Sequence, residues 1–466
     1  MNITTFAPST PNRYGLFVCL MAALAGLLFG LDIGVISGAL PFIAKQYALG
    51  DHTQEWIVSS MMVGAAAGAV GAGWLSWRTG RRYALGLAAI MFIVGSVWSA
   101  LAAGPEQLIG ARLLLGLAVG VASFTAPLYL SEVAPKQVRG AMISTYQLMI
   151  TVGILAAFIS NIGLSYIGNW RWMLGVIALP ALLFLLGVAA LPDSPRWLLQ
   201  RKRVSEARAV LRRLYRNPAD VEAEIHEFNQ QIAQPKQGWG LLRTNSNFRR
   251  SVLLGAVLQI FQQITGINVV MYYAPRIFAL ANFATHEQQL WATVIVGLVN
   301  VLATFGAIAL VDRWGRKPIL YTGCGIMAFG MGALALLLHL GMTHPLSQWM
   351  AVGTLLLFIA GFAMSAGPLV WILCSEIQPL QGRDFGIAIS TFVNWTANMV
   401  VAATFLSLLA SIGESQTFLL YALLNVAFAV AVFLYVPETR GVSLEHIERN
   451  LMAGRRLRDL GKRFER

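Results

Sequence analysis

The sequence predicts an all-α polytopic membrane protein. Of its 466 residues, 57% are hydrophobic and only 12% are charged, a balance that water-soluble domains of this size do not have. Apolar runs long enough to cross a bilayer recur along the chain. All but four of the 34 Lys and Arg residues fall at the termini or in alternate loops; the exceptions are Lys45, Arg112, Arg171 and Arg276. This distribution predicts two cytoplasmic termini, and it argues against nucleic-acid binding despite a net charge of +13.

We expect twelve spans in two groups of six. They cover approximately 14–43, 56–77, 83–103, 107–130, 140–166, 171–191, 251–281, 289–311, 318–340, 346–374, 384–410 and 416–436. The expected organisation is an N-terminal half at 1–191, a linker at 192–250, a C-terminal half at 251–436 and a tail at 437–466. Charges alternate with Leu, Val and Ala at helical spacing within the linker, so short cytoplasmic helices are expected there and after Ser443 in the tail.

Three loop motifs occur twice, once in each group of spans. The pairs are Arg78-Thr-Gly80-Arg81-Arg82 with Arg313-Trp-Gly315-Arg316-Lys317, Ser131-Glu132-Val-Ala-Pro135 with Ser375-Glu376-Ile-Gln-Pro379, and Pro192-Asp-Ser-Pro-Arg196 with Pro437-Glu-Thr-Arg440. Their offsets are 235, 244 and 245 residues. The same order at nearly the same offset indicates two homologous halves.

The seventh span is unusually rich in polar side chains. They are Gln259, Gln262, Gln263, Thr265, Asn268, Tyr272 and Tyr273. On a straight helix the three glutamines and Tyr273 fall within an arc of about 100°, while Asn268 and Tyr272 fall about 80° or more outside it. A helix broken near Thr265 and Gly266 would aim both groups at one point, as in the binding sites of secondary transporters. Interhelical hydrogen bonding is the alternative explanation.

Asp32 lies among glycines and aliphatic residues inside the first span. An unpaired carboxylate there would cost several kcal/mol, so it must be neutral, paired or in a wet cavity. Arg112 is the only basic residue deep within a span and is the expected partner. A buried pair that merely fixes the packing of two helices is the alternative to a role in proton coupling.

The repeated motifs, together with Gln262-Gln-Ile-Thr-Gly-Ile-Asn268, resemble those of the sugar porters of the major facilitator superfamily. The resemblance covers nearly the whole chain. It implies the major facilitator fold, with twelve transmembrane helices in two homologous six-helix halves, and a secondary active transporter rather than an enzyme. There is one departure: Trp77 stands where the first-half motif of the family usually has Asp.

The function that this resemblance implies is proton-coupled import of a monosaccharide by alternating access across a bacterial inner membrane. The expected sugar is D-galactose and also D-glucose, and Asp32 would carry the proton. L-arabinose or another pentose, a passive sugar facilitator and a non-transporting sugar sensor are the alternatives. The expected partners are the monosaccharide, the proton and the lipid bilayer, and the protein is expected to work as a monomer. No cofactor is expected because the proton gradient supplies the energy.

A sugar site needs neutral donors and acceptors for hydroxyl groups and a flat ring for apolar C–H faces. Besides the seventh-span residues Gln262, Gln263, Asn268, Tyr272 and Tyr273, the resemblance implies Gln147, Asn300, Trp371, Asn394 and Trp395. Each is polar or aromatic within an otherwise apolar span, and interhelical packing could explain any one of them alone. The absence of charge argues against amino acids, organic acids or phosphates as cargo.

Charged residues at the cytoplasmic span ends are expected to form a gate. They are Glu132, Arg139, Asp312, Arg316, Glu376 and Arg383. In both halves an arginine follows the glutamate by seven residues, which predicts salt bridges that hold the halves together when the cytoplasmic side is closed. Solvated interfacial charges that only set topology are the alternative.

Several other chemistries are not expected. The six histidines and three cysteines show no metal-ligand spacing, so no metal site is predicted. The glycine-rich stretch at 64–73 has no preceding strand and no Lys-Ser/Thr, and small residues at four-residue spacing instead favour close helix packing. No nucleophile with a neighbouring base is recognisable.

Overall fold

The computed structural model describes residues 13–134, 139–215, 218–232, 238–342 and 344–462, apart from the side chains at 139–141, 219, 227, 229–232 and 312. Twelve helical segments are long and apolar enough to cross a membrane, and the described residues contain no strand. The protein is therefore a multi-pass membrane protein of the predicted all-α class. Helices suit this environment because they satisfy all backbone hydrogen bonds within one segment.

The first six spans run from α1 to α7. Their bounds are α1 Arg13–Tyr47, α2 Asp51–Thr79, α3 Arg81–Leu101, α4 Pro105–Val133, α5 Arg139–Ser165, α6 Trp170–Gly175 and α7 Ala178–Ala190, the last two forming one span.

The last six spans run from α12 to α20, and three of them contain or adjoin a break. Their bounds are α12 Ser246–Ile264, α13 Ile267–Leu280, α14 His286–Trp314, α15 Arg316–Leu340, α16 Pro345–Met364, α17 Ala366–Glu376, α18 Arg383–Ala402, α19 Phe405–Ile412 and α20 Glu414–Tyr435.

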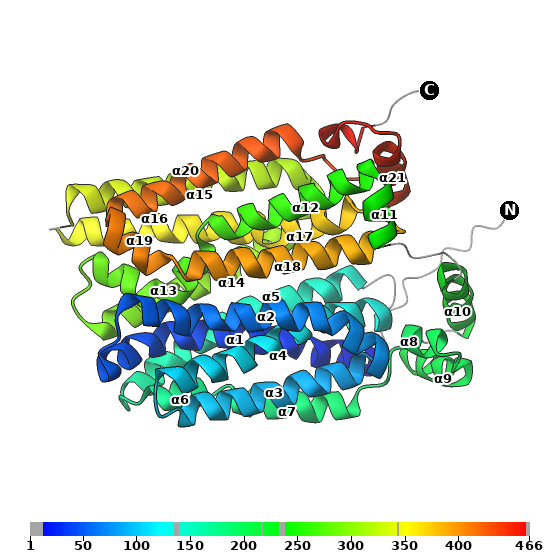
Figure 1. Ribbon diagram of the computed structural model, residues 1–466, viewed down its shortest axis with the longest axis horizontal. Coiled ribbons are helices and arrows are strands. Elements are labelled where there is room, and N and C mark those ends of the chain that lie inside the picture. Colours follow the sequence, from blue (N-terminus) through cyan, green and yellow to red (C-terminus); the bar gives the residue numbers. More distant parts are fainter. Residues whose placement is uncertain (1–12, 135–138, 216–217, 233–237, 343, 463–466) are drawn as a thin grey trace.

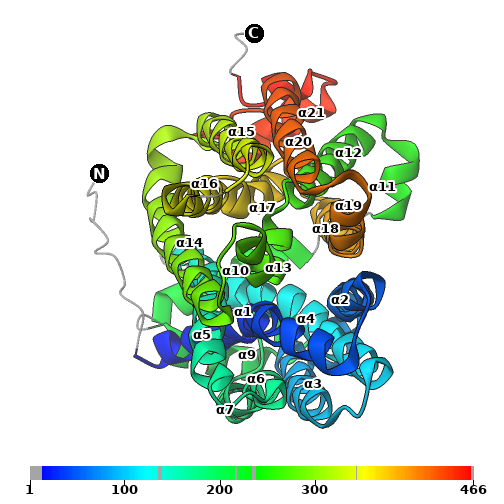
Figure 2. The same ribbon diagram turned by 90° about the vertical axis from the view of Figure 1, so that its left-hand side faces the viewer.

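The two groups of spans repeat one packing pattern (Figures 1 and 2). In the first group α1 packs on α5, α2 on α4, and α3 on both α4 and α7. The corresponding pairs in the second group are α12 with α18, α14 with α16, and α15 with both α16 and α20. The groups meet along α5 with α14, α2 with α18, and α1 with α13. We call them the N-terminal and C-terminal halves.

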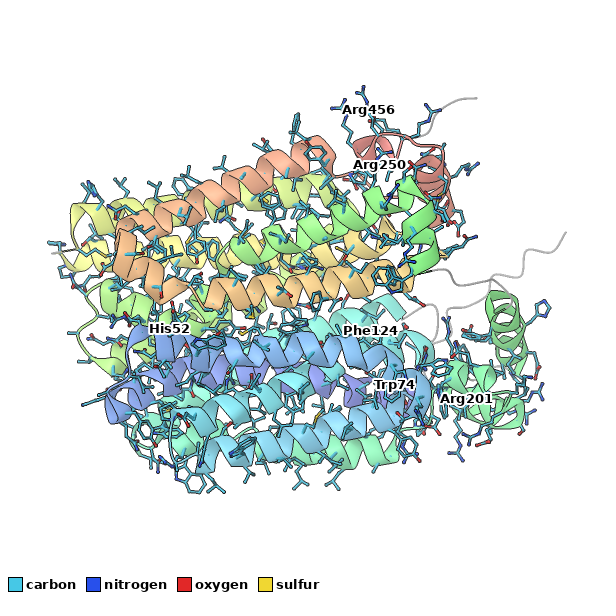
Figure 3. All side chains as sticks on the ribbon, viewed as in Figure 1. His52, Trp74, Phe124, Arg201, Arg250 and Arg456 are labelled. Atoms are coloured by element: carbon cyan, nitrogen blue, oxygen red, sulfur yellow. The ribbon has the colours of Figure 1, made fainter. Side chains whose placement is uncertain are left out.

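The helices outside the spans gather at one end of the bundle (Figure 1). They are α8 Pro195–Gln200, α9 Val204–Leu214, α10 Pro218–Ile232, α11 Trp239–Thr244, α21 Leu444–Met452 and the 3-10 turn Leu457–Asp459. We call this the linker end and the opposite one the far end. Arg201, Arg250 and Arg456 lie at the linker end, whereas His52 lies towards the far end (Figure 3). The helices expected in the linker and after Ser443 are confirmed, and Ser443 caps α21 through the His446 N–H.

Small residues set the distance between α2 and α4. A Cβ atom on Gly64 would lie 2.2 Å from the Leu113 carbonyl oxygen, and one on Gly116 would lie 2.0 Å from the Met61 carbonyl oxygen. The two backbones are thus in direct contact, which is how membrane helices gain packing energy without a hydrophobic driving force. Gly71 lies further along the same helix, and a Cβ there would meet open space.

Gly64→Ala should therefore destabilise the protein, because the added methyl group forces α2 and α4 apart. The expected cost is about 1–3 kcal/mol, as for other overpacked contacts. The measurement is the midpoint of thermal unfolding in detergent. Gly71→Ala is the matched control, and it should leave the midpoint unchanged. Equal midpoints for the two variants would contradict the close α2–α4 contact.

Candidate functional site

The seventh span is broken where the sequence predicts. α12 ends at Ile264, α13 begins at Ile267, and Gly266 between them has φ of 93°. Only glycine adopts this left-handed conformation without strain. The amide of Asn425 on α20 donates to the Thr265 carbonyl oxygen at 3.1 Å, and so satisfies a backbone group that the break frees.

The break brings the predicted amides into one continuous hydrogen-bonded cluster. Asn268 on α13 donates to the Gln263 Oε1 at 2.6 Å, across the break, and Gln263 donates to the Gln262 Oε1 at 3.4 Å. Asn394 on α18 then donates to the Gln262 and Gln259 side-chain oxygens at 2.8 and 2.6 Å. We call these five residues the amide cluster. All its members are uncharged, and only Asn268 is more than marginally exposed.

The amide cluster also reaches a second helix break. The tenth span divides at Ser365, between α16 and α17. Gln262 donates to the Ala366 and Gly367 carbonyl oxygens at 2.8 and 3.2 Å, directly after that break. Sequence inspection had placed Gln262 in the cluster but could not identify these backbone partners.

The remaining expected sugar residues are not hydrogen-bonded to the amide cluster among the described residues. Trp395 is buried, and its ring lies 5.5 Å from that of Phe29 in the other half. Trp371 on α17 is 37% exposed. Asn300 is buried on α14, and Gln147 is half-buried on α5.

The two tyrosines of α13 point to different partners. The Tyr273 hydroxyl donates to the Ala402 carbonyl oxygen at 3.0 Å, at the end of α18, so it supports the helix rather than the amide cluster. The Tyr272 hydroxyl is buried near the Asn398 side chain on α18. α13 therefore carries one amide into the cluster, and its two tyrosines lie against α18.

Asp32 and Arg112 form the expected ion pair. The Arg112 Nη1 lies 2.7 Å from the Asp32 Oδ1, and both side chains are fully buried. The pairing is incomplete, because the second carboxylate oxygen and two guanidinium nitrogens have no hydrogen-bond partner among the described residues. A buried pair needs such additional bonds to offset desolvation, so this one is held less firmly than a purely structural pair.

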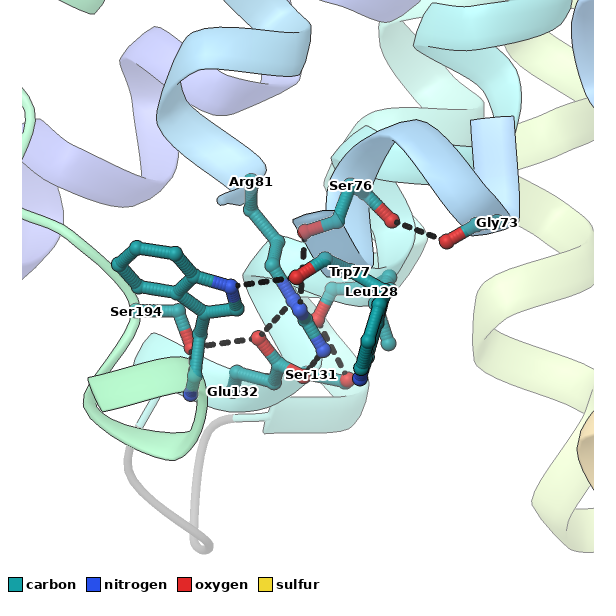
Figure 4. Close-up of polar contacts among 9 residues, drawn as sticks. Gly73, Ser76, Trp77, Arg81, Leu128, Ser131, Glu132 and Ser194 are labelled. Atoms are coloured by element: carbon teal, nitrogen blue, oxygen red, sulfur yellow. Dashed lines mark hydrogen bonds and ion pairs between the residues drawn. The ribbon is translucent and has the colours of Figure 1, made fainter. Parts of the chain in front are cut away.

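At the linker end, each half contains the same cluster of an arginine, a glutamate and a hydroxyl, and Figure 4 shows the cluster of the N-terminal half. In the N-terminal half Arg81 donates two bonds of 2.9 Å to Glu132, which also accepts from Ser194. In the C-terminal half Arg316 lies 3.4 Å from Glu376, which also accepts from Thr439. The hydroxyls come from the Pro-Asp-Ser-Pro-Arg and Pro-Glu-Thr-Arg motifs, so all three repeated motifs meet at one place in each half.

Two of the expected gate residues, Arg316 and Glu376, bind each other within the C-terminal half. Glu132 and Glu376 each bind an arginine of their own half, and Arg383 donates to the Gln378 carbonyl oxygen instead of pairing with Glu376. The reason is proximity: Arg81 and Arg316 begin the helices that lie beside the glutamates. The side chains of the other two expected gate residues, Arg139 and Asp312, lie outside the described part of the chain.

Trp77, the departure from the family motif, is part of the linker-end packing. Its carbonyl oxygen accepts from the Trp197 indole at 2.9 Å and from Arg201 at 3.1 Å, and the Arg201 guanidinium lies 5.0 Å from the Trp77 ring. These contacts tie α8 to the end of α2.

Among the described residues, the polar contacts recorded between the two halves are at the far end. Ser407 donates to Glu55, and the Tyr166 hydroxyl donates to Glu287 at 2.7 Å. Sequence inspection did not find either pair. Glu55 lies one residue before the expected second span and four residues after Asp51, so its place in the sequence gave no signal.

Known proteins resemble this chain along nearly its full length. Residues 18–451 match the family described as "Sugar (and other) transporter". The galactose-proton symporter of Escherichia coli K12 is 60% identical over 96% of both chains, and the arabinose-proton symporter of the same strain is 54% identical over 99% of this chain and all of that one.

A solved structure agrees with these relatives. A partially occluded inward-open conformation of the xylose transporter XylE from E. coli matches with a TM-score of 0.81 at 30% identity, covering 93% of this chain and all of that one. With this fold, the family match and relatives of such high identity, the chain belongs to the sugar porters of the major facilitator superfamily.

Proposed function

We propose that this protein is a proton-coupled monosaccharide symporter, with D-galactose as its principal sugar and D-glucose as a second, working by alternating access. The observation that carries the proposal is the incompletely satisfied Asp32–Arg112 pair, placed beside the helix that joins the amide cluster. The name of the 60% identical relative supports both the proton and the galactose.

The amide cluster is suited to a sugar because its hydrogen bonds can be exchanged. Amide groups donate and accept, as hydroxyl groups do, so a bound sugar replaces amide–amide bonds with amide–hydroxyl bonds at little net cost. The cluster contains no charge, which would disfavour acids and phosphates. Gln263 and Asn268 are the residues that we assign most directly to sugar hydroxyls, because their mutual bond crosses the break.

Coupling follows from the position of α13. A proton on Asp32 removes the negative charge that holds Arg112, and α13 packs against α1, the helix that carries Asp32. Because Asn268 lies on the same short helix, a shift of α13 would change the sugar site and the charged pair together. This link gives the protein a physical means of making sugar binding depend on protonation.

We further propose that the linker end faces the cytoplasm of a bacterium, with both termini on that side of the inner membrane. The concentration of Arg and Lys at that end is the basis for this orientation. The far end would then be the outer face, and the conformation described here would be closed to the outside. We expect the monomer to be the working unit and no cofactor to be required.

A pentose is the second candidate substrate, because the arabinose-proton symporter is 54% identical over the full chain. A panel of galactose, glucose, arabinose and xylose competing for uptake into vesicles separates the two. A passive facilitator is disfavoured by the buried carboxylate of Asp32. Uptake of labelled sugar would also exclude a sensor that binds without transport.

Gln263→Ala and Asn268→Ala should each weaken galactose binding by about 1–3 kcal/mol, roughly 5- to 150-fold. Each change removes an amide that bonds the sugar and leaves its former partner unpaired. Calorimetry or ligand-induced fluorescence on the purified protein measures the affinity. Gln348→Ala is the matched control, since that amide bonds the Asn282 carbonyl oxygen away from the cluster. Unchanged affinity in both cluster variants would place the sugar elsewhere.

Asp32→Asn should abolish sugar accumulation against a gradient and sugar-induced alkalinisation of the medium. The amide keeps the size of the carboxyl group but cannot carry the coupling proton. Sugar binding should persist because the amide cluster lies on other helices. Since Arg112 loses its anion in this variant, its folding is checked first by its thermal midpoint and by sugar binding. Full uphill accumulation by the folded variant would rule out Asp32 as the coupling group.

A further inference from the structure

Glu55 is a buried carboxylate at the far end that the proposed transport mechanism does not use. It lies in the second turn of α2, and its side chain is 1% exposed. Burying a charge so completely is costly unless the group is hydrogen-bonded. Its neighbour His52, 4.0 Å away, is 81% exposed and therefore leaves the burial of Glu55 uncompensated.

The partners of Glu55 come from the opposite half. Ser407 on α19 donates its backbone N–H to the Glu55 Oε1 and its hydroxyl to the Oε2, both at 2.7 Å. Both carboxylate oxygens are thus satisfied by one residue across the boundary between the halves. Hydrogen bonds to an ionised acceptor are about twice as strong as neutral ones.

The N-terminus of α19 is not capped by its own N-cap residue. The first N–H groups of a helix have no partner inside the helix and are normally bound by the side chain of the N-cap residue. Here the N-cap is Thr404, but its hydroxyl donates back to the Val400 carbonyl oxygen at 2.8 Å, and it makes no capping bond. Glu55 supplies the missing acceptor, and its negative charge also suits the positive end of the helix.

The same helix break is connected to α13. Tyr273 bonds the last carbonyl group of α18 through Ala402, and its ring lies 5.2 Å from that of Phe405, the first residue of α19. α19 is therefore fastened on one side to the helix of the amide cluster and on the other side to Glu55. A movement of α13 would therefore be transmitted to the Glu55–Ser407 contact through α19 alone.

We propose that Glu55 stabilises the state of the protein that is closed at the far end, because its carboxylate caps α19 from the opposite half and so positions that helix. We call the Glu55–Ser407 pair the latch. Glu55 is a positioning residue, since it does not contact the amide cluster. Opening the far end breaks both bonds to Ser407 and leaves the N-terminus of α19 uncapped. This proposal depends on the proposed alternating access. It adds the residue pair that determines what fraction of the protein is closed at the far end.

The test measures the accessibility of a reporter thiol from the far end. Ser59 lies one turn along α2 from Glu55 on the same face of the helix, and it is fully buried. In a Ser59→Cys protein reconstituted in vesicles, a membrane-impermeant thiol reagent labels the cysteine only when the far end opens. The native cysteines Cys19, Cys324 and Cys374 are buried, and the protein without the reporter gives their background.

Glu55→Ala should raise the labelling rate by about tenfold or more, because two hydrogen bonds to a charged group are lost in the closed state only. Glu55→Gln should raise it less, since the amide can still bond both groups of Ser407. Ser407→Ala, which keeps the backbone N–H, should give a severalfold increase. Ser407 is an exposed residue and loses only its hydroxyl, so this variant tests the latch even where Glu55→Ala fails to fold.

Glu287→Ala is the matched control. Glu287 also accepts a hydrogen bond across the halves at the far end, but that pair is exposed and should contribute little. Wild-type labelling in both Glu55→Ala and Ser407→Ala, or an equal increase in Glu287→Ala, would overturn the latch. Sugar uptake by the same vesicles tests the proposed function separately, since a protein without a latch still transports and a non-transporter takes up no sugar.

Discussion

The constraint that organises this structure is that no backbone hydrogen-bonding group can be left unpaired inside a membrane. Unbroken helices meet it automatically, but the C-terminal half breaks three of its spans, and each break is met by a side chain from another helix. Asn425 serves the break after Thr265, Gln262 the break after Ser365, and Tyr273 the break after Ala402. The polar residues within these spans are therefore necessary to the fold before they serve any ligand.

The two halves carry different kinds of polar group. The C-terminal half carries the neutral amide cluster, and the N-terminal half carries the Asp32–Arg112 pair. α13 lies between them, because it supplies Asn268 to the amide cluster and packs against α1, the helix that carries Asp32. Had the charge been placed within the amide cluster, the site would favour charged ligands. Separation by one short helix keeps the amide cluster neutral, and it would let the proposed sugar site respond to protonation of Asp32.

The two ends of the bundle are held by different means. At the linker end the clusters around Glu132 and Glu376 fasten each half internally, which keeps each six-helix unit rigid when the other moves. At the far end Glu55 and Ser407 join the halves to each other. Such units are suited to rocking, since the far-end contact can break without disturbing either unit.

Much of this architecture is determined by the sequence alone. Apolar runs set the spans because lipid excludes charge, glycine at position 266 marks the break because only glycine takes its backbone conformation, and lone charges in apolar runs identify Asp32 and Arg112 as a pair. Tertiary structure decided the partners. Glu376 pairs with Arg316 rather than Arg383, and Glu55 reaches Ser407, because these contacts depend on which helix ends lie side by side. Sequence spacing defines neighbours along one helix, whereas packing between helices defines the rest.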